Sequence, residues 1–367
     1  MIRLSKCSIG ASEKQQVVGV LEREYLGMGT DVIEFEQRLE GFIGGGRSVV
    51  CVNSGTAAIQ VALEALNIGA GDSVLVPSLT YVATFQAISA TGALPIPCEV
   101  DPNTLFIDVK DARKRIRSCT KAIVPVHYAS QAHGLSELRD FACEFNLRIV
   151  EDAAQAFGCC YNSEKVGSTG DITCFSFDGI KNITCGEGGC IVTSDDQVLE
   201  YSKDMRLLGV RKDSERRAVG QRSWDFDVER QGYRYHMSNI NAAIGLAQLS
   251  RINEFASRRQ YIANKYVELL SSVSEVSCVF ADYRDIIPHL FVIKARERDG
   301  LRAYLAEKGI ETGIHYKPNH LLSRYALGYN LPVTESLYAE LLSLPCHVDL
   351  KDTELTYIAE EISAYYA

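Results

Sequence analysis

The sequence ITCFSFDGIKNITCGEGG, residues 172–189, sets a single lysine, Lys181, between an apolar run and a glycine cluster. The run 172–177 has the length and the aromatic and β-branched content of a buried strand. A lysine is ordinarily a solvated surface charge. One that follows a buried strand and is surrounded by small residues is instead a candidate covalent catalyst, and we treat Lys181 as such.

Strand-like and helix-like segments alternate on both sides of this stretch. Strands separated by helix-length segments predict a largely parallel sheet with right-handed crossovers. The expected strands are 48–52, 73–76, 94–99, 121–126, 147–150, 172–177 and 190–193, and the expected helices are 12–26, 31–42, 57–67, 82–91 and 136–145.

The pattern changes after residue 237. A long helical stretch, 239–270, is followed by a strand at 289–293 and by helices at 297–308 and 352–366. A chain of 367 residues is long for one hydrophobic core, so we expect two domains. The predicted division is a large domain of residues 1–249, which includes the N-terminal helices, and a small α+β domain of residues 250–367, with a hinge near residue 250.

Composition argues against several classes of protein. The formal net charge of −9 is unfavourable for a general binder of nucleic acid or of an anionic membrane. No apolar run is long enough to span a bilayer, and the start, MIRLSKCSIG, lacks the apolar region of a signal peptide. The twelve cysteines form no Cys-x-x-Cys pair, so we interpret them as reduced, small apolar residues, and we expect a cytoplasmic protein without a bound metal.

The tripeptide Ser54-Gly55-Thr56 lies between the first strand and an alanine-rich helix. In an open parallel sheet, ligands bind outside the carboxyl ends of the strands. Backbone N–H groups at a helix N-terminus, beside a glycine that permits close approach, can hold a phosphate. The alternative interpretation is a plain helix N-cap.

A second strand ends in Asp152, three residues before Gln155. Enzymes with a lysine such as Lys181 most often bind pyridoxal phosphate (PLP) as a Schiff base, and PLP chemistry needs a carboxylate that keeps the pyridine nitrogen protonated. A charge pair at about 4 Å gains roughly 4 kcal/mol at an effective dielectric near 20, which is on the order of three pKa units. The alternative role for Asp152 is a helix N-cap.

Two further side chains fit the same ligand. Ser176, two residues before the turn that leads to Lys181, can supply another phosphate contact. Tyr81 opens a helix after Pro77 and is placed to stack on a planar ring, with packing in the core as the alternative.

Taken together and in this order, the segments resemble the sugar aminotransferases of the DegT–StrS family. The resemblance rests on four motifs, residues 53–58, 77–84, 150–157 and 175–189, and extends to 27–35, 232–249 and 344–347. It implies a three-layer α/β fold of the fold type I, aspartate-aminotransferase-like kind, with a mostly parallel sheet in the large domain and a smaller α+β C-terminal domain.

The resemblance also implies roles at the matching positions. Lys181 would form the Schiff base and carry the proton between cofactor and substrate carbons, and Asp152 would pair with the pyridine nitrogen. Gln155 would contact the cofactor near its phenolic oxygen, and Tyr81 would stack on the ring. The implied phosphate ligands are Ser54, Gly55, Thr56 and Ser176.

One departure from the family pattern concerns the segment Gly-x-Asn-x-Arg-Met, whose asparagine reaches the PLP phosphate of the partner subunit. Here residues 232–237 read GYRYHM, so that Arg234 stands in place of the asparagine and His236 in place of the arginine. Arginine also binds phosphate, and does so bidentately. We therefore expect Arg234 to be a cross-subunit phosphate ligand, the alternative being a surface arginine at the interface.

A second departure concerns the substrate. Several members show His-Tyr-Pro where this chain has His315-Tyr316-Lys317-Pro318. This turn is expected to face the crevice, where Lys317 would meet a pyrophosphate or the donor's carboxylate, or else remain a solvated loop lysine. The expected substrate contacts are Met28, His315, Tyr316 and Lys317.

The resemblance implies an aminotransferase that takes an amino group from an amino acid, by analogy L-glutamate, and passes it to a nucleotide-linked keto sugar. A 4-keto-6-deoxyhexose is favoured as acceptor, with a C3-specific enzyme for 3-keto sugars as the alternative. Members are homodimers with shared active sites. A sugar dehydratase on this fold would carry histidine in place of Lys181, and a non-enzymatic PLP-binding regulator is disfavoured because the acidic chain has no DNA-binding appendage.

Overall fold

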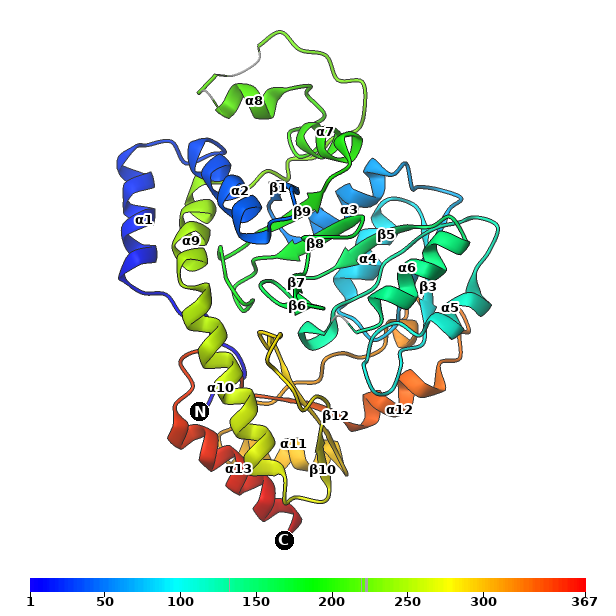
Figure 1. Ribbon diagram of the computed structural model, residues 1–367, viewed down its shortest axis with the longest axis vertical. Coiled ribbons are helices and arrows are strands. Elements are labelled where there is room, and N and C mark those ends of the chain that lie inside the picture. Colours follow the sequence, from blue (N-terminus) through cyan, green and yellow to red (C-terminus); the bar gives the residue numbers. More distant parts are fainter. Residues whose placement is uncertain (132, 219, 222–223) are drawn as a thin grey trace.

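A computed structural model describes residues 1–131, 133–218, 220–221 and 224–367 (Figure 1). Within these residues, seven strands form a central sheet in the order β1-β9-β8-β5-β4-β2-β3. The strands are β1 (Ser48–Val52), β2 (Ser73–Pro77), β3 (Leu94–Cys98), β4 (Thr120–Ile123), β5 (Arg148–Asp152), β8 (Ile172–Ser176) and β9 (Gly189–Thr193).

The expected largely parallel sheet is confirmed, with β9 as the exception. Strand β9 pairs antiparallel with both β8 and β1, whereas β5–β8, β4–β5, β2–β4 and β2–β3 are parallel pairs. The reason is the connection 177–188, which has no helix to carry the chain back across the sheet. Because β1 and β8 both oppose β9, they run in the same direction, and their carboxyl ends meet at one edge.

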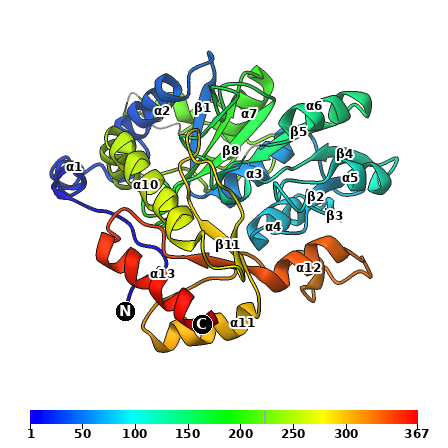
Figure 2. The same cartoon turned by 60° about the horizontal axis from the view of Figure 1, so that its bottom comes forward.

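Alternating side chains divide the core between the two faces of the sheet. Val150 and Cys174 pack with α3 on one face, whereas Ile149 and Phe175 belong to the cluster on the other face. Helices α3, α4 and α7 cover the first face, and α2, α5, α6 and α9 cover the second (Figures 1 and 2). The result is the three-layer α/β fold that the sequence predicts. The large-domain helices are α1 (Ala11–Glu22), α2 (Thr30–Ile43), α3 (Gly55–Ala65), α4 (Val82–Ala90), α5 (Val109–Arg115), α6 (Leu135–Glu144), α7 (Asp196–Met205), α8 (Asp213–Ala218) and α9 (Asn239–Ser250).

Residues 252–366 form a second, smaller unit in which helices pack on a three-stranded sheet. Its three-stranded sheet, in the order β10-β11-β12, is antiparallel, and α10, α11 and α13 pack together beside it (Figure 2). The elements are α10 (Ile252–Leu270), β10 (Val276–Cys278), β11 (Phe291–Ala295), α11 (Arg298–Glu307), α12 (Pro332–Glu340), β12 (Leu341–Leu344) and α13 (Asp352–Tyr366). Short elements complete the chain: β6 (Cys160–Tyr161), β7 (Glu164–Lys165), and the 3₁₀ turns η1 (Tyr128–Ser130) and η2 (Asn319–Leu321).

Other features also differ from the sequence-based expectation. The helical stretch 239–270 is two helices, because Arg251 leaves the helical conformation between α9 and α10. The strand expected at 289–293 begins two residues later, since Arg259 binds the carbonyls of Pro288 and His289 and removes them from the ladder. The first residues lie on the small domain, where Ile2 pairs with Ile310. The domain boundary at 249/250 itself stays a prediction.

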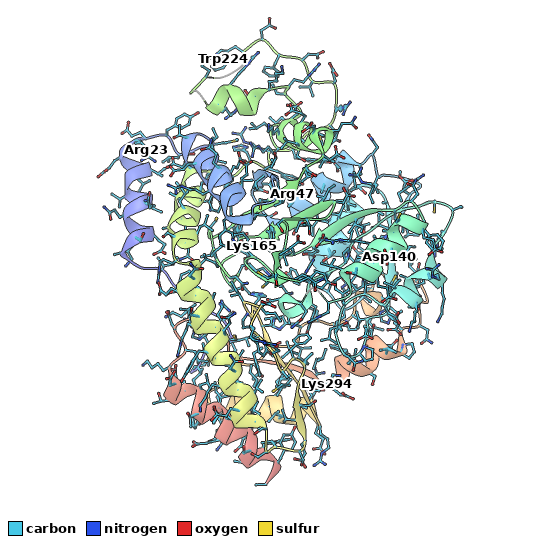
Figure 3. The ribbon with its side chains drawn as sticks, viewed as in Figure 1. Arg23, Arg47, Asp140, Lys165, Trp224 and Lys294 are labelled. Atoms are coloured by element: carbon cyan, nitrogen blue, oxygen red, sulfur yellow. The ribbon has the colours of Figure 1, made fainter. Side chains whose placement is uncertain are left out.

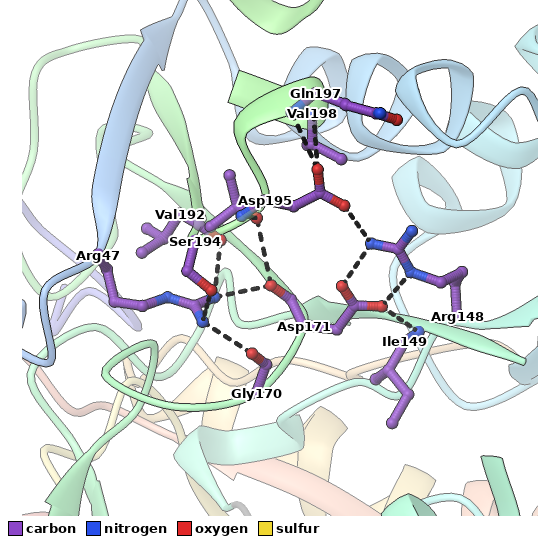
Figure 4. Close-up of polar contacts among 11 residues, drawn as sticks. Arg47, Arg148, Ile149, Gly170, Asp171, Val192, Ser194, Asp195, Gln197 and Val198 are labelled. Carbon is purple, nitrogen blue, oxygen red and sulfur yellow. Dashed lines mark hydrogen bonds and ion pairs between the residues drawn. The ribbon is translucent and has the colours of Figure 1, made fainter. Parts of the chain in front are cut away.

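An ion-pair network fastens the amino ends of the strands, at the edge opposite the carboxyl ends (Figure 4). Arg148, at the start of β5, donates to both carboxylate oxygens of Asp171 at 2.6 and 2.7 Å and to Asp195 at 3.0 Å. Arg47, just before β1, donates to the carbonyls of Gly170 and Asp171, both at 2.7 Å. The network thus joins the amino ends of β1, β5 and β8.

Among the described residues, none of the helices combines the length and the apolarity that a membrane span requires.

Candidate active site

The carboxyl ends of β1, β2, β5 and β8, with the loops that follow them, enclose a cavity of about 430 Å³. Most of the side chains predicted from the sequence line it. The lining residues are Ser54, Gly55, Thr56, Ile59, Thr80, Tyr81, Ala83, Thr84, Val126, Asp152, Ala154, Gln155, Ser176, Asp178, Ile180, Lys181, Glu187, His315 and Tyr316.

The N-terminus of α3 opens into this cavity. Ser54 is the N-cap and its hydroxyl accepts a hydrogen bond from the N–H of Ala57 at 3.1 Å. A side chain at Gly55 would come within 2.8 Å of the Ser176 Cβ, and one at Gly189 within 2.5 Å of the Ser54 carbonyl. These glycines therefore allow the start of α3, the end of β8 and the start of β9 to approach closely. Ser54 can cap α3 while the backbone N–H groups of the same turn remain able to hold a phosphate.

Asp152 ends β5 with its side chain in the cavity, and the residue is 6% exposed. Its Oδ2 accepts from the Thr84 hydroxyl at 2.7 Å and its Oδ1 from the Ala154 N–H at 3.1 Å. The following residues form a turn, so Asp152 is not a helix N-cap. Among the described residues no side chain forms an ion pair with this carboxylate, although the charge of Lys181 acts on it, and a buried charge is costly without a close positive partner.

Lys181 follows a tight turn after β8. The Lys181 N–H donates to the Asp178 carbonyl at 3.1 Å, and Asn182 fixes the loop by donating to the carbonyls of Phe157 and Ile287 at 3.0 and 3.1 Å. Burial lowers the pKa of Lys181, and the negative charges of Asp152 and Asp178 oppose this shift without cancelling it. The amine is thus more easily deprotonated than that of a surface lysine, as a nucleophile requires.

Gln155 and two tyrosines complete the cavity wall. The Gln155 Oε1 accepts from the Ala129 N–H at 2.7 Å, and its Nε2 donates to the Tyr316 hydroxyl oxygen at 3.0 Å. Burial, reinforced by the charge of Asp152, raises the pKa of Tyr316, so its hydroxyl stays protonated. Tyr81 is 58% exposed, not in the core, and its ring centroid lies 5.5 Å from that of Tyr316.

The turn that carries His315 and Tyr316 is fastened to the large domain. Asn319 donates to the carbonyls of Ser78 and Thr80 at 3.1 and 2.8 Å. His320 lies between the Ser78 hydroxyl at 2.8 Å and the Glu335 carboxylate at 3.1 Å. This serine–histidine–glutamate row does not form a hydrolytic site, because Ser78 is fully buried. It fastens the 3₁₀ turn η2 to the large domain.

Three predicted residues lie elsewhere. Met28 is buried in the core, and Lys317 follows the cavity without lining it. Arg234 lines a separate hollow with Trp224 and His236. Contacts of these three with a substrate or a partner's cofactor stay predictions, as do the roles assigned to the residues that line the cavity.

Several side chains at or beside the site were not predicted from the sequence, among them Thr84, Asp178, Glu187 and His289. Thr84 lies in the first turn of α4, within the motif 77–84, and Asp178 and Glu187 lie after β8, within the motif 175–189, which is a signal that they face the same edge. His289 had no such signal, because it comes from the small domain more than a hundred residues after Lys181.

A wider groove of about 680 Å³ lies on the small domain, lined by parts of β10, β11 and α11. It is an open surface feature of mixed charge. The cavity at the carboxyl edge is smaller, but it holds a lysine of lowered pKa beside a buried carboxylate, and a titratable group with a perturbed pKa in a pocket marks a candidate functional site. We therefore assign the active site to the cavity.

PLP fits this set of residues. The unpaired carboxylate of Asp152 calls for a buried cation, which a protonated pyridine ring supplies, and the glycine-lined α3 N-terminus accommodates a phosphate. When bound, PLP acts as the electron sink for changes at the substrate carbon. Fold and site thus define a PLP-dependent enzyme on the fold type I scaffold.

The chain belongs to the DegT/DnrJ/EryC1/StrS aminotransferase family, whose model matches residues 7–363. It is 33% identical to the spore coat polysaccharide biosynthesis protein SpsC of Bacillus subtilis, covering 96% of this chain and 94% of that protein. It is 37% identical to the GDP-perosamine synthase of Escherichia coli O157:H7, covering 86% and 85%.

Solved structures agree with this membership. A putative sugar aminotransferase of Streptococcus pneumoniae, Spr1654, matches in its PMP form with a TM-score of 0.90 and 30% identity over 99% of this chain and 98% of that chain. The PLP form of the same protein matches with a TM-score of 0.91. The protein is therefore a PLP-dependent sugar aminotransferase.

Proposed function

We propose that the protein transfers an amino group from L-glutamate to the keto carbon of a nucleotide-linked 4-keto-6-deoxyhexose, for polysaccharide or glycoconjugate synthesis. The observation that carries the proposal is the cavity in which Lys181 and the unpaired carboxylate of Asp152 meet. The relatives support the substrate class, since one is named for a nucleotide-linked sugar and another for polysaccharide biosynthesis.

Each residue of the cavity has a separate task in this proposal. Asp152 holds the proton on the cofactor's ring nitrogen, and Thr84 fixes the carboxylate by its hydrogen bond of 2.7 Å. Lys181 would hold the cofactor through its amine, and its Nζ would carry a proton to and from the reacting carbon. Gln155, held by Ala129 and Tyr316, would contact the cofactor near its phenolic oxygen, and Tyr81 would stack on the ring.

We further propose a homodimer in which Arg234 reaches the partner's cofactor phosphate. Lys181 is the single lysine or arginine among the residues that line the cavity, and a phosphate dianion calls for further positive charge. Arg234 is exposed and follows the segment 208–228, which has several exposed apolar side chains, including Trp224 at 85% exposure (Figure 3). The other exposed apolar residues of this segment are Leu208, Phe226 and Val228.

A second copy of the chain accounts for both features. An exposed apolar cluster of this kind is costly in water and typical of a protein interface. Covering it with a second molecule would bury Trp224 and would carry Arg234 towards a cavity in which Lys181 is the single lysine or arginine among the described lining residues.

The proposed function is tested with a panel of nucleotide-linked keto sugars, presented one at a time with PLP and L-glutamate. We expect 2-oxoglutarate to accumulate with a 4-keto-6-deoxyhexose and the new amine to appear at C4 by NMR. Amination at C3 would contradict the proposed position and establish the 3-keto alternative. Loss of the sugar oxygen without amination would indicate a dehydratase, and PLP binding without turnover of any sugar would indicate a regulator.

A further inference from the structure

His289 of the small domain faces the amine of Lys181. Its Nε2 lies 3.5 Å from the Lys181 Nζ, and the histidine is 4% exposed. The two residues come from different domains of the predicted division, so their contact depends on how the domains pack. This pair is not part of any motif that the sequence analysis identified.

Hydrogen bonds to Ser130 and Arg259 fix the backbone around His289. Its N–H donates to the Ser130 hydroxyl at 3.0 Å, and the carbonyl before it, that of Pro288, accepts from the buried guanidinium of Arg259 at 3.1 Å. Asn182, the neighbour of Lys181, donates to the Ile287 carbonyl at 3.1 Å. The lysine loop and the histidine segment are therefore tied together directly, which sets the separation of Nζ and Nε2.

The protonation of His289 suits an acceptor. Burial, reinforced by the positive charges of Lys181 and Arg259, lowers the pKa of His289 well below its usual value, so the ring is neutral at pH 7. For Nε2 to accept from the lysine, Nδ1 must carry the proton. Nδ1 is buried and has no hydrogen-bond partner among the described residues. A buried donor without a hydrogen-bond partner, such as this Nδ1–H, costs about 1–3 kcal/mol of stability. A histidine kept at this position despite that cost is therefore a candidate for a functional role.

We propose that His289 is a positioning residue that orients the free amine of Lys181 during proton transfer. The inference rests on the proposed role of Lys181. In this proposal Lys181 is a free amine during the proton transfer. A neutral amine has two N–H bonds and one lone pair. With one N–H directed to His289 Nε2, the Nζ rotation is restricted and the lone pair is available to the cavity, where it takes the substrate's proton.

Two variants separate orientation from packing. His289→Gln places an amide oxygen near the position of Nε2 and keeps an acceptor, whereas His289→Leu removes it. His347→Leu is the matched control, because His347 is also buried in the small domain with an unpaired Nδ1 and a pKa lowered by burial and by Arg259, whereas the Lys181 Nζ contacts His289. If His289 had only a packing role, His289→Leu and His347→Leu would change the pKa of Lys181 and the rate of amine transfer to the same extent.

The first measurement uses the cofactor-free protein. The pH dependence of Lys181 labelling by an amine-reactive reagent, read by peptide mass spectrometry, reports the pKa of Nζ. Since an acceptor stabilises the ammonium form, His289→Leu should lower the labelling midpoint by about half a pH unit or more, with His289→Gln and His347→Leu close to wild type. This readout needs no sugar substrate, so it stands even if the proposed acceptor is wrong.

The second measurement is single-turnover amine transfer in the PLP-loaded protein. We expect His289→Leu to slow the proton-transfer step roughly tenfold, with PLP affinity within about twofold of wild type, and His289→Gln to recover most of the rate. The proposal would be overturned if His289→Leu had the same labelling midpoint and the same turnover rate as the wild-type protein. Equal losses in His289→Leu and His347→Leu would also overturn it, since these would reflect packing alone.

Discussion

At the scale of single residues, Asp152 and Thr84 show how a buried charge is prepared for a ligand. The carboxylate accepts two hydrogen bonds from its own chain, and these fix its orientation without neutralising it. A cation that arrives in the cavity therefore meets an acceptor that needs no rearrangement. Such preorganisation is the usual source of electrostatic catalysis.

Replacing Asp152 by asparagine should separate binding from chemistry. The Asp152→Asn side chain keeps the size of the carboxylate but not its charge, so PLP should still bind while the turnover number falls at least about a hundredfold. Thr84→Val is the milder comparison, with about a tenfold loss, because it removes one hydrogen bond and leaves the charge. Absorbance titration with PLP and steady-state assays measure the two effects. Unchanged turnover in Asp152→Asn would remove its assigned role.

His315 should make the stability of the cofactor-free protein depend on pH. Burial, with the nearby Lys181, lowers the pKa of His315 to about 4, whereas an unfolded chain has the ordinary value of a histidine. Between these two values the unfolded state binds the extra proton, so the contribution of His315 is complete above the unfolded pKa and is lost as the pH falls towards 4.

The test compares urea unfolding of wild type and His315→Gln from pH 7 to pH 4.5. Glutamine can keep a hydrogen bond to Ser343, which lies 2.8 Å from the histidine Nδ1, but it does not titrate. The wild-type free energy of unfolding should fall more steeply, by up to about 1.4 kcal/mol per pH unit relative to the variant. Parallel profiles would show that His315 is protonated as easily in the folded protein as in the unfolded chain.

At the scale of elements, the network of Arg47, Arg148 and Asp171 holds the strand starts while the opposite strand ends carry the site (Figure 4). Asp171 also accepts from the Ile149 N–H at 3.2 Å, so loss of its carboxylate removes an acceptor from both the Arg148 guanidinium and the Ile149 N–H at the start of β5. The network should therefore affect the stability of the sheet more than the chemistry of the cavity.

Asp171→Ala should lower the free energy of unfolding by about 1–2 kcal/mol, a value reduced for the partial exposure of the pair. Chemical denaturation measures this loss. Asp140→Ala on α6 is the control, since that carboxylate is exposed (Figure 3) and should change the stability by less than about 0.5 kcal/mol. Equal stability of the two variants would show that the network contributes nothing.

The elements that local pattern specifies were predicted, and those that depend on distant contacts were not. The strands that end at Asp152 and Ser176 follow from short apolar runs with polar ends. Helix α7 was missed although its N-cap, Asp195, accepts from the N–H groups of Gln197 and Val198, a signal that could have found it. The antiparallel course of β9 was not specified, because periodicity does not report the direction in which a strand is paired.

The same limit applies to the site. Gly55, Asp152 and Lys181 stand at the ends of predictable elements, so their convergence follows from the rule for parallel sheets. The positions of His289 and of the 315–320 turn depend on Arg259, Asn319 and their carbonyl partners, and no local pattern encodes such contacts.

At the scale of the whole molecule, the proposed dimer predicts complementation between inactive variants. Lys181→Ala removes the covalent lysine and Arg234→Ala removes the proposed cross-subunit ligand. In a mixed dimer, the intact Lys181 of one subunit would meet the intact Arg234 of the other. Random exchange should restore about a quarter of wild-type activity, because half of the dimers are mixed and each has one complete site of two.

The mixed sample is compared with each variant alone, and sedimentation measures the oligomeric state. Mixing without recovery, in dimers shown to exchange subunits, would place Arg234 and Lys181 in the same chain's site or remove Arg234 from the site altogether. A monomeric wild-type protein with full activity would contradict the shared site.

The central claim is that Lys181 holds PLP covalently in the cavity at the carboxyl edge of the sheet. Borohydride reduction of the PLP-loaded protein, followed by peptide mass spectrometry, tests it most directly, because reduction makes the lysine–cofactor bond permanent. The account predicts a pyridoxyl label on Lys181, located in the peptide that follows β8. A label on another lysine, or none in protein saturated with PLP, would contradict it.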